Sequence, residues 1–132
     1  MAFRCPCGLP AVIETFPLVD GRPFPTLYWL TCVRASGAVG GLEASGVMRD
    51  LTALLREDPD FAAAFEAAEL DYVSKRDALA KLDGGAGVGG GPSDRVKCLH
   101  AHLAHHLVCR CNPVGAWVEE RIPDVLRPPP CV

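Results

Sequence analysis

Two different hydrophobic periods follow one another along the chain, and the first of them indicates strands. Residues 11–16 (AVIETF) and 27–31 (LYWLT) are rich in β-branched and aromatic side chains, which favour strands. Between them, Asp20-Gly21 is a turn signal. We therefore predict a β-hairpin over residues 8–32, whose second strand ends at Cys32.

Beyond this hairpin the apolar residues recur every three or four positions, which predicts helices. Asp58-Pro59 is typical of a helix start, because aspartate caps free N–H groups and proline fits the first turn. A later helix is expected to be capped by Ser93 or Asp94 and to run to about Val108. The expected helices cover residues 36–44, 47–56, 59–82, 95–108 and 116–121.

These elements predict an α+β fold: one small domain over residues 1–132, with an N-terminal β-hairpin packed against four or five helices. Residues 84–92 are expected to be a glycine-rich connector, and residues 127–132 a frayed tail. The connector formally contains G-x-G-x-x-G, but a helix precedes it where the dinucleotide fingerprint needs a strand. An alternative is an anion-binding loop assisted by Arg95 and Lys97.

Length and charge narrow the class of protein. The chain has 132 residues, which suits one domain, and no apolar stretch approaches the roughly 20 residues of a membrane helix. The first residues lack the apolar core of a signal peptide, so we expect a cytoplasmic protein. The net charge of −3 gives no bulk attraction for nucleic acid or an acidic membrane. A protein partner is left open.

Cysteine and histidine are the residues that suggest chemistry. The cysteines number seven, an odd total that an all-disulfide framework would not use up, and the four histidines all fall between His100 and His106. In a reducing compartment, clustered cysteine and histidine more often bind metal or take part in catalysis than form disulfides. The cysteines are Cys5, Cys7, Cys32, Cys98, Cys109, Cys111 and Cys131.

Helical spacing suggests a zinc site. If residues 94–108 are helical, Cys98 and His102 are an i, i+4 pair that can reach one ion, as two histidines do in H-E-x-x-H. Tetrahedral zinc needs two more ligands, and Cys5 and Cys32 are the first candidates. The predicted set is therefore Cys5, Cys32, Cys98 and His102, with His100, His105 and Cys7 as alternative or second-shell residues.

Other interpretations of the same residues stay open. In one alternative, Cys5 and Cys7 join Cys109 and Cys111 as two C-x-C pairs, which we rank lower. In another, the helix is simply buried on both sides, with hydrogen-bonded histidines and packed cysteines. In a third reading, Cys98 is a nucleophile activated by a histidine, although no third orienting residue is evident.

Several blocks resemble one protein family. RCPCGLPAVIET, DGRPFPTLYWLTC, LEASGVMRDLT, DRVKCLHAHLAHHL and NPVG, in that order, are similar to the uncharacterised actinobacterial family called domain of unknown function 501. Its pattern matches Cys5, Cys32, Cys98, His100 and His105.

The resemblance bears on the choice of ligands. The family alternates cysteine and histidine at the Cys32 position, which implies a metal ligand there. It does not fix Cys7 or His102, so it favours His100 or His105 as the fourth ligand where helical spacing favours His102. Cys109 and Cys111 look peculiar to this chain.

Together these observations predict a small cytosolic zinc-binding domain with a structural or protein-interaction role. The alternative is an enzyme that uses a zinc-activated water or a Cys98 nucleophile. Its substrate would be unidentified, with phosphorylated molecules among the candidates because of Arg95 and Lys97. The family brings no established activity.

Overall fold

The computed structural model describes residues 2–6, 8–81, 87–88, 94–123 and 125, and its strands lie in the N-terminal part of the chain. An antiparallel sheet contains, in this order, β1 (Phe3–Arg4), β2 (Pro10–Glu14) and β5 (Tyr28–Leu30). A separate small hairpin pairs β3 (Leu18–Val19) with β4 (Arg22–Pro23). The predicted pairing is confirmed, since Ile13 lies opposite Trp29.

The turn between β3 and β4 falls at Asp20-Gly21, where the sequence predicts one. Both residues have a positive φ, 51° at Asp20 and 75° at Gly21. A two-residue hairpin turn of type I′ needs positive φ at both central positions, which aspartate and glycine tolerate best.

Helices make up the rest of the fold. Two of them begin three residues before the predicted start, because Cys32 and Asn112 cap them with side chains that accept backbone N–H groups. The predicted cap at Asp58 is confirmed: its Oδ1 accepts from the N–H groups of residues 60 and 61. The helices are α1 (Val33–Ala44), α2 (Val47–Glu57), α3 (Pro59–Leu79), α4 (Leu99–Cys109) and α5 (Pro113–Arg121).

The predicted start of α4 is wrong. Asp94 lies in a turn, Ser93 falls outside the described residues, and Cys98 is the N-cap, with an extended backbone at φ −140° and ψ 110°. Distant residues hold this segment in place. Thr52 accepts a hydrogen bond from the Val96 N–H at 3.0 Å, and Glu43 accepts one from the Leu99 N–H at 3.0 Å.

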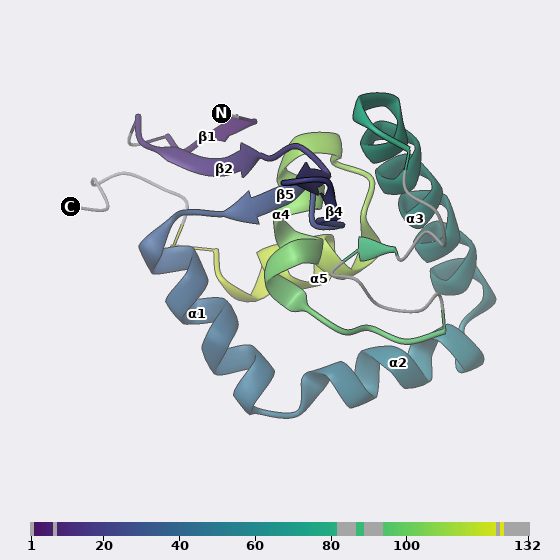
Figure 1. Ribbon diagram of the computed structural model, residues 1–132. Coiled ribbons are helices and arrows are strands. Elements are labelled where there is room, and N and C mark those ends of the chain that lie inside the picture. The colour runs from purple at the N-terminus through teal and green to yellow at the C-terminus, as the bar shows by residue number, and fades with distance from the viewer. Residues whose placement is uncertain (1, 7, 82–86, 89–93, 124, 126–132) are drawn as a thin grey trace.

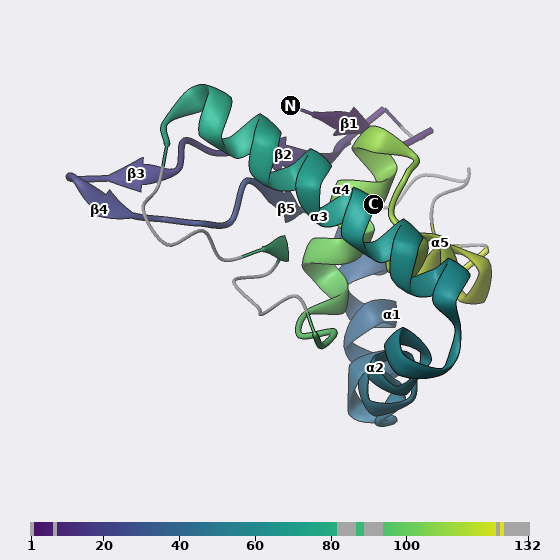
Figure 2. The same ribbon diagram turned by 90° about the vertical axis from the view of Figure 1, so that its right-hand side faces the viewer.

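α4 is the centre of the molecule. Eight of its eleven residues are buried, which is the pattern of a helix covered on all sides. Figures 1 and 2 show it between the sheet above and α1 and α2 below, and it contacts α1, α5, β2 and β5. The α+β fold predicted from the sequence is therefore confirmed.

Two predicted segments fall mostly or wholly outside the described residues. Of the glycine-rich connector, Gly87 and Val88 are described and buried, and Val88 packs in the core. The rest of residues 84–92 and the tail at 127–132 are not described. No helix in the described part of the chain is both long and apolar enough to cross a membrane.

Candidate functional site

Side chains of the kinds that bind metals come together at two places in the described part of the chain. Among the described residues, two groups of three or more His, Cys, Asp or Glu side chains have ligand atoms within 4.8 Å of one another. Neither group contains Cys5, Cys32 or His102. Cys5 is buried after β1, and Cys32 is buried at the start of α1, where its sulfur accepts from the Ala35 N–H. As ligands, these three residues stay a prediction.

The first group joins α1 to the start of α4, and we call it the α1–α4 group: Glu43, Cys98 and His100. All three side chains are half-buried, and Cys98 is a free thiol. Glu43 Oε1 lies 3.2 Å from His100 Nδ1, while Oε2 caps the helix at Leu99. The group thus contains the predicted ligand Cys98 and the alternative ligand His100.

The second ring nitrogen of His100 is also held. Nε2 lies 3.1 Å from the carbonyl oxygen of Ser36. Since a carbonyl only accepts, Nε2 carries a proton and donates it. Metal-binding histidines usually donate their other ring N–H in this way, which fixes the ring orientation and leaves the remaining nitrogen free to bind.

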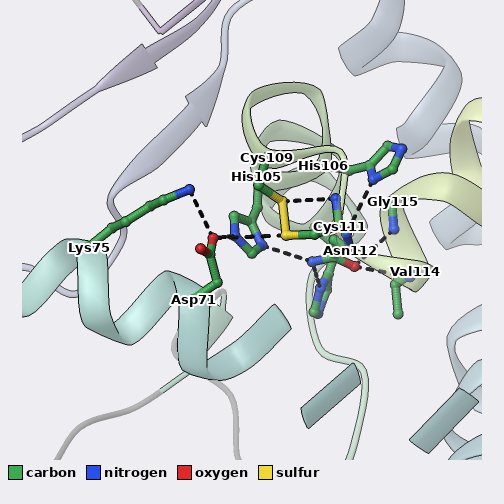
Figure 3. Close-up of a disulfide and its surroundings, with 10 residues drawn as sticks. Asp71, Lys75, His105, His106, Cys109, Cys111, Asn112, Val114 and Gly115 are labelled. Carbon is green, nitrogen blue, oxygen red and sulfur yellow. Dashed lines mark hydrogen bonds and ion pairs between the residues drawn. A yellow bond between two sulfur atoms is a disulfide. The ribbon is translucent and has the colours of Figure 1, made fainter. Parts of the chain in front are cut away.

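The second group lies where α3 meets the C-terminal end of α4, and we call it the α3–α4 group: Asp71, His105, Cys109 and Cys111. Asp71 Oδ2 is 2.8 Å from His105 Nε2, 3.0 Å from Lys75 Nζ and 3.9 Å from the sulfur of Cys111 (Figure 3).

Cys109 and Cys111 form a disulfide in this group. The intervening Arg110 ends α4 with φ 57°, and this left-handed turn folds the two cysteines toward each other. The sequence interpretation, in which thiols stay reduced and these two cysteines are discounted, does not anticipate the bridge.

Asn112 organises the histidines of α4. Its Oδ1 accepts from the N–H groups of Val114 and Gly115 at the start of α5, so its Nδ2 must be the atom that faces the rings. Nδ2 lies 3.0 Å from His102 Nδ1 and 3.1 Å from His105 Nδ1. Figure 3 draws the contact between Asn112 and His105 as a dashed line.

This arrangement fixes the tautomers. Because an amide nitrogen only donates, both Nδ1 atoms accept, and each neutral ring carries its proton on Nε2. His106 follows the same pattern, since its Nδ1 accepts from the Asn112 backbone N–H at 3.2 Å.

Burial keeps these rings uncharged. It lowers the pKa of His102 to about 3, with repulsion from His105 adding to the effect. Burial also lowers the pKa of His105 and of His106. Asp71, in contrast, is charged. Burial raises its pKa, but hydrogen bonds from His105 and Lys75 outweigh that effect and lower the pKa, so the carboxylate stays ionised.

The expected pairing of Cys98 with His102 depends on a helix that includes Cys98. Because α4 begins at Leu99, the Cys98 side chain lies with Glu43 and His100 instead. Of the two predicted anion-binding residues, Arg95 lines a cavity, whereas Lys97 is exposed and is not among the lining residues. Cys7 lies outside the described residues.

Three residues that lie in these two groups or hydrogen-bond to their histidines were not predicted from the sequence: Asn112, Glu43 and Asp71. Asn112 carried a usable signal, since Asn112-Pro113 is an N-cap followed by proline, the same pattern that located Asp58-Pro59. Glu43 and Asp71 carried none, because their histidine partners are 57 and 34 positions away and ordinary helix-surface carboxylates look the same.

Comparison with known families agrees with the sequence resemblance. The family described as "Protein of unknown function (DUF501)" matches residues 1–120. The chain belongs to this family. No curated protein and no solved structure matches this DUF501 chain. The family description names no activity.

Proposed function

We propose that this DUF501 chain is a small zinc-binding domain whose ion, held by the α1–α4 group, joins α1 to α4 in a structural or protein-interaction role. The observation that carries the proposal is the convergence of Glu43, Cys98 and His100, with ligand atoms within 4.8 Å of one another. Carboxylate, thiolate and imidazole are all ligands that zinc uses in proteins.

The ring of His100 supports this choice. Nδ1, which faces Glu43 Oε1 at 3.2 Å, would bind the zinc ion, and Nε2 would keep its hydrogen bond to the Ser36 carbonyl. Metal binding at this group therefore needs no change of tautomer at Nε2 and no reduction of a disulfide.

The α3–α4 group is the weaker candidate, although it offers four donors. Its two sulfurs ligate only as thiolates, so the Cys109–Cys111 bridge must first be reduced. A zinc ion at His105 Nε2 would also leave the ring proton on Nδ1, against the donating amide of Asn112. Binding there would require that amide to turn and lose its cap on α5.

An enzyme is the second candidate function. The α1–α4 group offers three side-chain ligands, and catalytic zinc sites commonly keep three protein ligands and one position for water. A bound water at that position would be acidified and could act as a nucleophile. A closed coordination sphere of four protein ligands would exclude this form.

Zinc analysis of purified protein tests the proposal. We expect about one zinc per chain and a lower Tm after chelation, since an ion that binds only the folded state stabilises it. Replacing zinc by cobalt should give a thiolate-to-metal absorption band that depends on Cys98. A metal-free protein whose Tm ignores both zinc and chelator would overturn the proposal.

Matched variants locate the ion. Cys98→Ser and His100→Gln should lose it, while the double variant Cys109→Ser/Cys111→Ser should keep it. Cys32→Ser is the control, because Cys32 is also an N-cap cysteine, at α1. Loss of zinc in the double variant alone would move the site to the α3–α4 group. Loss in Cys32→Ser would return it to the set predicted from the sequence.

A further inference from the structure

A hollow between α2 and the segment that leads into α4 is lined by three arginines. The cavity has a volume of about 450 Å³ and is open to solvent. This volume lies within the range of small-molecule sites, roughly 300–1,000 Å³. Its lining residues are Met48, Arg49, Thr52, Ala53, Arg56, Asp94, Arg95 and Val96.

Helical spacing places two of these arginines together. Arg49 and Arg56 are seven positions apart on α2, so they lie on the same face two turns from each other. Thr52 lies between them on that face. One helix therefore supplies both arginines to the lining of the cavity.

The third arginine comes from a segment that is fixed in place. Thr52 Oγ1 accepts a hydrogen bond from the Val96 N–H at 3.0 Å, and the Val96 side chain is buried. Figure 1 shows the segment running beside α2 on its way into α4. Arg95 directly precedes this anchor, so it is held near Arg49 and Arg56 at the rim of the cavity.

The charges of the lining residues do not cancel. Three arginines against Asp94 leave two positive charges, in a chain whose net charge is −3. None of the three arginines forms an ion pair with any residue that the structure describes. Their donors are exposed and available to a ligand.

We propose that this cavity binds a small molecule bearing a phosphate or pyrophosphate group. Guanidinium groups form paired hydrogen bonds to phosphate oxygens, and three of them around one hollow suit a group with several charged oxygens. The positive charge is confined to a cavity of small-molecule size on an acidic protein, which favours a phosphorylated small molecule over nucleic acid. This site is separate from the proposed zinc group and does not depend on it.

Titration with inorganic pyrophosphate, inorganic phosphate and citrate, followed by NMR or calorimetry, tests the proposal. We expect saturable 1:1 binding, with pyrophosphate tighter than phosphate and citrate weaker than both. Arg49→Ala, Arg56→Ala and Arg95→Ala should each weaken pyrophosphate binding about tenfold or more, because each removes hydrogen bonds between charged groups. Arg95→Lys, which keeps the charge but loses the paired donors, should also weaken it.

Arg22→Ala is the matched control, since it removes an exposed arginine from the β3–β4 hairpin and should leave binding unchanged. Far-UV circular dichroism would verify that each variant folds. Absence of saturable binding, or equal weakening by Arg22→Ala, would overturn the proposal, as would citrate binding as tightly as pyrophosphate.

Repeating the titration with zinc-depleted protein separates the two proposals. Pyrophosphate binding should persist there, whether or not the α1–α4 group holds zinc. If pyrophosphate bound only when zinc is present, the anion would be binding to the metal, and the proposal of an arginine-lined site would be overturned.

Discussion

At the scale of single residues, Asn112 shows how one side chain can serve two structures. Its side-chain carbonyl oxygen caps α5, and its amide nitrogen donates hydrogen bonds to two imidazole rings inside the core. Every hydrogen-bonding atom of the side chain is therefore used, in a position that is only 1% exposed. A residue of this kind is hard to replace, because no other side chain has the same donors and acceptors at the same length.

Replacing Asn112 by alanine should lower the free energy of unfolding by about 2–4 kcal/mol. The lost cap accounts for about 1 kcal/mol, and the two ring nitrogens left without a donor account for the remainder. Urea unfolding at neutral pH would measure the change.

Asn112→Ser separates the two contributions. Serine caps a helix about as well as asparagine but cannot reach the rings as an amide does, so it should recover only about 1 kcal/mol of the loss. A serine variant as stable as the natural chain would mean that the rings do not need this donor.

At the scale of elements, a single hydroxyl connects α3 to the segment that enters β5. Tyr72 Oη accepts from the buried Leu27 N–H at 2.6 Å and lies 3.4 Å from the Pro25 carbonyl oxygen. The residues are 45 and 47 positions apart in sequence, so this contact fixes the sheet against the long helix. Tyr28 packs edge-on against the same ring.

Tyr72→Phe should destabilise the protein by about 1–3 kcal/mol, because the Leu27 N–H would remain buried without an acceptor. Thermal or urea unfolding would measure the loss. Tyr28→Phe is the control: its hydroxyl has no hydrogen bond to any described residue, so removing it should cost much less. Equal losses in the two variants would contradict the role assigned to Tyr72.

Elements whose boundaries depend on neighbouring residues were predictable from the sequence. The turn at Asp20-Gly21 and the cap at Asp58 both follow from local backbone preferences. The start of α4 was not, because Glu43, 56 positions from Leu99, supplies the acceptor for its first turn. The same separation in sequence explains why the α1–α4 group was only partly predicted. Cys98 was predicted as a metal ligand, but nothing near Glu43 in the sequence indicates that it lies beside Cys98.

At the scale of the whole molecule, the core contains a row of neutral histidines. His102, His105 and His106 are all buried. The pKa of each is lowered by burial, that of His102 to about 3. An unfolded chain would bind protons at these rings near the ordinary value of 6.5, so the two states differ in proton affinity over a wide range of pH.

Stability should therefore fall as the pH drops below about 6.5, and the contribution of His102 should continue to fall toward pH 3. The folded pKa values lie below the unfolded ones, so acid favours the unfolded chain, with a slope of up to about 1.4 kcal/mol per pH unit for each ring. Asp71 and Glu119, whose pKa values are also lowered, add to the loss in the range where carboxylates titrate.

Urea unfolding at pH 7.5, 6.0, 5.0 and 4.0 would measure this slope. A His102→Gln variant should show a shallower dependence, because one titrating ring is gone, even if its stability at pH 7.5 is lower. An unchanged slope in that variant would mean that His102 does not stay neutral in the folded protein.

The bridge between Cys109 and Cys111 has a consequence for chain entropy. It closes a ring of only three residues, so it restricts the unfolded chain little, by about 1.5 kcal/mol against roughly 3 kcal/mol for a 15-residue loop. The turn at Arg110 and the cap at Asn112 hold the corner between α4 and α5 by other means. The domain should thus keep its fold in either oxidation state, so that the redox conditions of its surroundings change the chemistry of one corner and leave the architecture alone.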